Sequence, residues 1–112
     1  MSEVDTLFAQ AEALKDQGRL DEAAQAYEQV LLTDSTHVLS CLSLAVVYGR
    51  LGRHDEAVER ARRACDLEPT DPFNFTALSV TYQRAWQGTQ HQPYIQLAEA
   101  AMAQAHALQG RH

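Results

Sequence analysis

The side chains in this sequence best suited to metal chemistry are its five histidines: His37, His54, His91, His106 and His112. A zinc site that can be recognised from sequence has ligands at characteristic spacings, such as HExxH, or a cluster of Cys and His residues a few positions apart. Neither pattern occurs among the five. Two of them, His37 and His54, fall where turns are expected and are interpreted as surface residues. We therefore predict no metal site and no bound cofactor.

The candidates for nucleophilic or acid–base catalysis are equally weak. Cys41 and Cys65 form no CxxC pair, and both fall on expected packing faces of helices, where burial raises the pKa of a thiol and makes it inert. We expect both to be reduced and buried. The sequence has no Gly-rich phosphate loop and no G-x-S-x-G motif. We predict that the protein is not an enzyme and has no catalytic residues.

Two pairs of carboxylates, at residues 21–22 and 55–56, belong to a short sequence that occurs twice. Residues 18–23 read GRLDEA and residues 52–57 read GRHDEA, 34 positions apart. In each copy the Gly is suited to end one helix, and the acidic pair is suited to the first turn of the next, where negative charge meets the positive end of the helix dipole. The Ala allows two helices to cross closely. Each copy is therefore predicted to be the corner of a helical hairpin.

Apolar residues on both sides of the corners recur with helical spacing. Positions 41, 44, 45 and 48 follow the pattern i, i+3, i+4, i+7 and share one face of a helix. Asp71 followed by Pro72 is typical of another helix start. We expect six helices, near residues 3–17, 21–33, 38–51, 55–67, 72–86 and 93–109.

The 34-residue period and the large–large–small–aromatic order of Cys41, Leu44, Ala45 and Tyr48 resemble the tetratricopeptide repeat. The family pattern continues after the second corner with Ala57, Ala64 and Pro69, and Leu7, Ala11, Leu14, Ala23 and Tyr27 repeat it around the first. The resemblance implies an all-α, right-handed α-solenoid of three helix-turn-helix hairpins, in a single domain over residues 1–112. The three repeats are expected at about 4–37, 38–71 and 72–110.

The third repeat is divergent. Small residues that lie 12 positions apart in the second repeat, Ala45 and Ala57, correspond to Ser79 and Ala98, which lie 19 apart. About seven residues are therefore inserted in or beside residues 86–93. With Trp86, His91 and Tyr94, the insertion is interpreted either as a second contact for a partner, through Trp86 and Tyr94, or as a longer turn in which Trp86 covers its own hairpin.

In this family the first helices of the hairpins line a concave groove that holds peptides. A second apolar stripe, Leu39, Leu42 and Val46, lies about 130° from the packing face of its helix. An alternative is that part of this surface packs within the domain, and that the arginines of the stripe are solvated or pair with Asp16 and Asp55. The groove predicted from the repeat register consists of Phe8, Leu39, Leu42, Val46, Arg50, Phe73, Thr76, Val80 and Arg84.

The 15 acidic and 9 basic side chains give a formal charge of −6, which argues against nucleic acid as a partner. No apolar run is long enough to span a membrane, and we expect a cytoplasmic protein. The predicted function is a non-catalytic protein–protein interaction module, which binds a peptide or helix of a partner with apolar anchors and an acidic group. Two alternatives stay open: a self-assembling scaffold unit that pairs through its Ala-rich last helix, and a chaperone-like holder of an apolar client segment.

Overall fold

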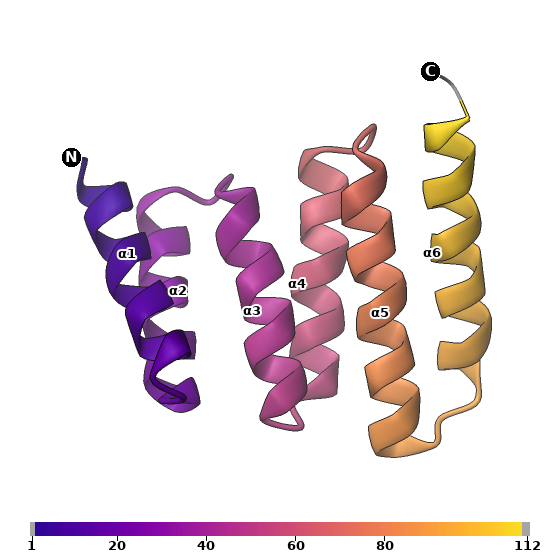
Figure 1. Cartoon of the computed structure of the whole chain (residues 1–112), viewed down its shortest axis with the longest axis horizontal. Coiled ribbons are helices and arrows are strands. Elements are labelled where there is room, and N and C mark those ends of the chain that lie inside the picture. The colour runs from indigo at the N-terminus through magenta and orange to yellow at the C-terminus, as the bar shows by residue number, and fades with distance from the viewer. Residues whose placement is uncertain (1, 111–112) are drawn as a thin grey trace.

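The structure is a computed structural model that describes residues 2–110, so His112 lies outside the described residues. The helices are α1 (Glu3–Asp16), α2 (Leu20–Thr33), α3 (Val38–Arg50), α4 (His54–Leu67), α5 (Pro72–Thr89) and α6 (Pro93–Gln109). They form three antiparallel hairpins set side by side in a row (Figure 1). The predicted solenoid of three hairpins is confirmed. Within residues 2–110, no helix is both long and apolar enough to cross a membrane.

The two repeated corners have the same local structure. Gly18 and Gly52 have φ angles of +76° and +77°, in the left-handed region that glycine adopts without steric cost. After each glycine an arginine pairs with the glutamate three residues on, Arg19 with Glu22 and Arg53 with Glu56. The acidic pairs lie in the first turns of α2 and α4. The prediction of two equivalent hairpin corners is confirmed.

The core lies between the helices of each hairpin and between neighbouring hairpins. Each first helix packs against its own second helix, and α2 and α4 also pack against the first helix of the next hairpin. The small residues predicted to allow close crossings, Ala23, Ala45 and Ala57, are buried. One cluster of buried side chains joins the first two hairpins, and another joins α4 to α5 and α6.

The inserted residues of the third hairpin lengthen a helix and not a turn. We expected α5 to end near residue 86, but it continues to Thr89, and only residues 90–92 connect it to α6. Gln90 ends the helix with a φ of +59°, and its backbone N–H donates to the carbonyl of Trp86 at 2.7 Å. The extra turn therefore extends the hairpin toward its corner end.

This extra turn packs against His54, which was expected to be a surface turn residue and is half-buried at the first position of α4. Its ring is so close to Gly88 that a Cβ atom added there would lie 2.2 Å from Nε2. The Nδ1 atom is buried and has no hydrogen-bond partner within the described residues. His54 is thus part of the packing between α4 and α5.

His37 is also more than a surface turn residue. It is the N-cap of α3, where its Nδ1 accepts from the backbone N–H of Ser40 at 3.3 Å. Its ring lies 4.9 Å from the ring of Phe8 on α1, between centroids. His37 is therefore half-buried and fixes the start of α3 against the first hairpin.

Candidate apolar groove and helix furrow

The residues of the predicted groove lie on α1, α3 and α5, which form the front layer of the molecule in Figure 1. We call these nine residues the groove stripe. Its most exposed apolar members are Phe73 and Leu39, which are 63% and 58% exposed. Leu42, Val46 and Thr76 are half-buried. Exposed aromatic and leucine side chains of this size are suited to contact a partner.

The α1 end of the groove stripe is tied to the core. The ring of Phe8 lies 5.9 Å from that of Tyr27, and Phe8 and Leu42 both pack against the first cluster of buried side chains. These two residues therefore support the fold as well as line a surface. Their substitution would affect stability and binding together.

Glu12 occupies the position in α1 that Val46 has in α3. Its Oε1 accepts hydrogen bonds from the hydroxyl of Tyr27 and from Ser43 Oγ at 3.3 Å, and Lys15 Nζ lies 3.3 Å away. Partial burial disfavours the charged carboxylate, but the hydrogen bond from Tyr27 and the charge of Lys15 outweigh it, so the pKa of Glu12 is lowered. The carboxylate joins α1, α2 and α3.

Two arginines lie at one end of the groove stripe. Arg50 is in the last turn of α3, and the side chain of Arg84 lies near the same end, because its Cδ would be 3.9 Å from a Cβ added at Gly49. Neither forms an ion pair in the described part of the chain, so the alternative that they pair with Asp16 and Asp55 is not seen. Two exposed guanidinium groups without a counter-charge favour an anionic ligand such as a carboxylate.

A furrow between α5 and α6, here called the helix furrow, was not predicted as a site. Its volume is about 390 Å³. Ser79 Oγ donates to the carbonyl of Ala98 at 2.8 Å, and Gln83 Nε2 donates to Ser79 Oγ at 3.2 Å, so the polar groups of its floor are already paired. Its signal in the sequence was the i, i+7 spacing of Ile95 and Met102. The lining residues are Ser79, Gln83, Trp86, Ile95, Ala98, Glu99 and Met102.

The structure does not bring the two residues of the predicted second contact together. Trp86 lines the helix furrow, against residues of its own hairpin. Tyr94 instead faces α4, where its hydroxyl donates to Asp55 Oδ1 at 3.2 Å and its ring lies 5.9 Å from that of Tyr82. Burial, together with this hydrogen bond to Asp55, raises the pKa of Tyr94. Tyr94 therefore links α6 to α4 of the second hairpin through this hydrogen bond.

A family model of the tetratricopeptide repeat matches residues 8–72, which is more than half of the chain. The chain belongs to the tetratricopeptide repeat family. The match begins within α1, covers the rest of the two regular hairpins and both repeated corners, and ends where the divergent third hairpin begins. No protein in a search of curated sequences matches this tetratricopeptide repeat chain.

Solved structures share the fold at low sequence identity. The crystal structure of MamA superimposes with a TM-score of 0.82 at 14% identity, over 96% of this chain and 59% of that one. The second tetratricopeptide repeat domain of Spaghetti (RPAP3), bound to an HSP90 peptide, gives 0.77 at 15% identity, over 96% and 93%. The translocator chaperone SycD of Yersinia enterocolitica gives 0.79 at 14%, over 94% and 73%. This chain therefore spans about three fifths of MamA.

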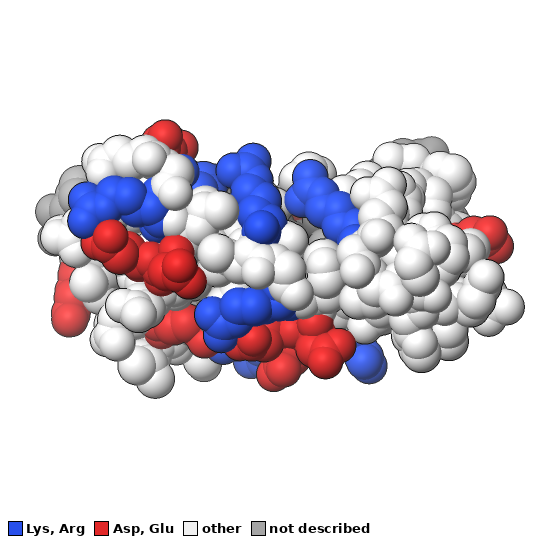
Figure 2. Space-filling model, turned by 90° about the horizontal axis from the view of Figure 1, so that it is seen from below, with Lys and Arg blue, Asp and Glu red and all other residues white. Residues whose placement is uncertain are grey.

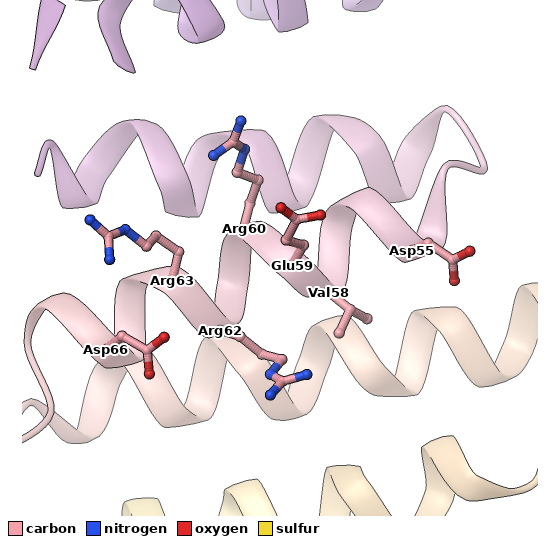
Figure 3. Close-up of a pocket in the computed structure, with 7 residues that line it drawn as sticks. All are labelled: Asp55, Val58, Glu59, Arg60, Arg62, Arg63 and Asp66. Carbon is pink, nitrogen blue, oxygen red and sulfur yellow. The ribbon is translucent and has the colours of Figure 1, made fainter. Parts of the chain in front are cut away.

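This tetratricopeptide repeat domain has another cavity, of about 420 Å³, on α4, and it shares no lining residue with the groove stripe or the helix furrow. Figure 3 shows Arg60 and Arg63 extending from one side of α4 and Arg62 from the other. Arg60 is held by Glu28 of α2, with Nη2 and Oε1 2.7 Å apart. Three acidic residues share the lining with the arginines, so the charges on this surface are balanced and give it no preference for an anion. They are Asp55, Glu59 and Asp66.

The cysteines of this domain lack the features of a nucleophile. Both are free and buried. Burial, with a smaller effect of Asp66, raises the pKa of Cys65 to about 11, and burial also raises the pKa of Cys41. Among residues 2–110, no three His, Cys, Asp or Glu side chains are placed to hold a metal ion.

Proposed function

We propose that this domain is a non-catalytic protein–protein interaction module that binds a segment of a partner protein along the groove stripe. Apolar side chains of the segment contact Leu39, Phe73 and Val80, which are exposed on two neighbouring first helices. Burial of such surface contributes about 25 cal/mol for each Å² of apolar area removed from water.

The observation that carries this proposal is the pair of unpaired arginines beside the apolar stripe. Arg50 and Arg84 are exposed and lie at the same end of α3, while the chain as a whole is acidic. A carboxylate of the partner, from an acidic side chain or a C-terminus, would pair with their guanidinium groups. The partner segment is therefore expected to combine apolar anchors with an acidic group.

The related folds support an interaction role in general terms. The RPAP3 domain is bound to an HSP90 peptide, and SycD is a chaperone of secretion translocators. Because the identities are 14–15%, neither partner is assigned to this chain. The buried, free state of Cys41 and Cys65 supports a reducing compartment such as the cytoplasm as the place of action.

A selection of displayed random peptides against the chain, followed by affinity measurements, tests the proposal. The best peptide is compared with its amidated or acid-to-amide form on four proteins: the unaltered chain, Leu39→Asp, Phe73→Asp and Arg84→Glu. We expect Leu39→Asp and Phe73→Asp to weaken binding about tenfold or more. Arg84→Glu is expected to weaken the binding of the acidic peptide and to leave the affinity for the neutral form nearly unchanged.

The matched control is Leu32→Asp. Leu32 is 78% exposed on α2, away from the groove stripe, so this variant is expected to bind normally. Leu39 and Phe73 are preferred to Leu42 because their exposed side chains are dispensable for the core. Peptide affinities that are the same in all five proteins would refute the groove.

A chaperone-like holder is the second candidate, because the groove stripe has two large apolar side chains, Phe73 and Leu39, that are more than half exposed. A holder would bind many unrelated apolar peptides with similar affinity and slow their aggregation. A module for one partner would select peptides of a shared sequence. The same peptide selection therefore separates the two.

A further inference from the structure

The last hairpin differs from the rest of the surface in its lack of charge. Of residues 85–110, only Glu99 is an Asp, Glu, Lys or Arg. Figure 2 shows the corner end of the molecule, where acidic and basic side chains cover α1 to α4 and the part over α5 and α6 is almost entirely uncharged. Interfaces between proteins are depleted of charge at their centre in the same way.

The helix furrow lies within this uncharged region, at the end of the row of helices, and no described helix lies beyond α6 (Figure 1). The large apolar side chains among its lining residues are those of Trp86, Ile95 and Met102. Aromatic residues and Met are enriched in protein interfaces. Because Gln83 Nε2 donates to Ser79 Oγ and Ser79 Oγ donates to the carbonyl of Ala98, the floor has few free donors for a polar ligand. The furrow therefore suits an apolar helix.

The charge distribution indicates which apolar helix would occupy the furrow. The chain has a formal charge of −6, so two copies repel each other overall. The hairpin of α5 and α6 is the region of the described surface where two copies can meet with the least repulsion. We propose that the chain forms a two-fold symmetric dimer in which α6 of each copy packs antiparallel against α6 and the helix furrow of the other.

The spacing along α6 is compatible with such a pairing. Ile95, Glu99, Met102 and His106 follow one another at intervals of four, three and four residues and share a face of the helix. In an antiparallel pair whose centre lies between residues 102 and 103, Glu99 lies opposite the partner's His106. The one carboxylate of the hairpin would thus face a hydrogen-bond donor.

The available surface is large enough. A standard interface buries about 800 Å² on each partner. That is about one eighth of the 6395 Å² accessible surface of this chain, and residues 85–110 make up nearly a quarter of its length. An interface through like surfaces is also the commonest arrangement among soluble oligomers.

Sedimentation equilibrium of the whole chain at concentrations from about 1 µM to about 1 mM tests the dimer. We expect the average mass to rise from 12.5 kDa toward twice that value. Met102→Glu should remain monomeric over the range, and the control Leu32→Glu on α2 should behave like the unaltered chain. Added salt should tighten the dimer, because it screens the repulsion between two acidic copies.

A second pair of variants keeps the test valid if Met102→Glu disturbs the fold. His106 is exposed, so its substitution leaves the core intact. His106→Glu places two carboxylates opposite each other and is expected to weaken the dimer about tenfold, whereas His106→Lys should not weaken it. A folded monomer at every concentration overturns the proposal, as does a dimer that neither Met102→Glu nor His106→Glu weakens. Both results are independent of whether the groove stripe binds peptides.

Discussion

The imidazole of His54 at the start of α4 lies directly against Gly88 in the last turn of α5. A Cβ atom at position 88 would come within 2.2 Å of Nε2 and 3.0 Å of two ring carbons. This contact joins the corner of the second hairpin to the extra turn of the third. A side chain at position 88 would therefore force the His54 ring to move, and the inserted residues take part in packing against the second hairpin.

Gly88→Ala is accordingly expected to destabilise the domain. One edge of the His54 ring is buried, so its displacement should cost about 1–3 kcal/mol, typical of overpacking, and more than offset the gain of about 0.5–1 kcal/mol from alanine in a helix. Urea denaturation followed by circular dichroism measures it. The double variant His54→Ala/Gly88→Ala should recover part of the loss, because the colliding ring is gone.

Gly49→Ala is the matched control for this prediction. A Cβ at Gly49 in α3 would make only an ordinary contact, 3.9 Å from Arg84 Cδ. Alanine is better suited than glycine to a helix interior by about 0.5–1 kcal/mol, so this variant should be more stable than the parent. Equal effects of the two substitutions would contradict the steric account of Gly88.

The third corner offers a gain in stability. Gln90 has a φ of +59°, whereas the two regular corners have glycine at +76° and +77°. A left-handed conformation costs a residue with a side chain about 1–2 kcal/mol. Gln90→Gly should therefore raise the free energy of unfolding by about 1 kcal/mol, after allowance for the larger backbone entropy of glycine.

Replacing the glycines of the two regular corners by alanine should lower the free energy of unfolding. Nothing lies within 4 Å of a Cβ at Gly18 or Gly52, so Gly18→Ala and Gly52→Ala would suffer only the backbone cost. We expect a loss of about 1–2 kcal/mol each. A thermal unfolding series of the three variants is sufficient, and a destabilised Gln90→Gly would show that the side chain of Gln90 contributes more than its backbone costs.

Glu12 should make the stability of the first two hairpins depend on pH. Burial disfavours the charged form, but the hydrogen bonds from Tyr27, Lys15 and Ser43 and the charge of Lys15 together outweigh it, so the pKa is lowered in the folded chain and folding favours the ionised form. That stabilisation is complete above the ordinary glutamate pKa of 4.5 and is lost as the pH falls below it. Glu12→Gln should lose stability at pH 7 and differ less from the parent near pH 3. A constant difference between pH 7 and pH 3 would contradict this.

The regular parts of the fold could be predicted from local sequence alone. Two glycine corners 34 residues apart, each followed by an acidic pair, have the same structure because a left-handed glycine and a charged first turn depend on few distant contacts. The buried alanines at 23, 45 and 57 follow from the same periodicity. Repetition made the prediction secure, since each copy supports the interpretation of the other.

The roles of single residues on the surface required the tertiary structure. His54 occupies the position that Leu20 has in the first corner, but its burial depends on Gly88, which lies 34 residues further along the chain. Trp86 and Tyr94 are close in sequence, but they lie on different helices of the hairpin. Trp86 lines the helix furrow, whereas Tyr94 contacts Asp55. Local propensity determined the helices and their corners. Only the packing of hairpin on hairpin decided which apolar side chains became core and which stayed on the surface, because that depends on contacts between residues far apart in the sequence.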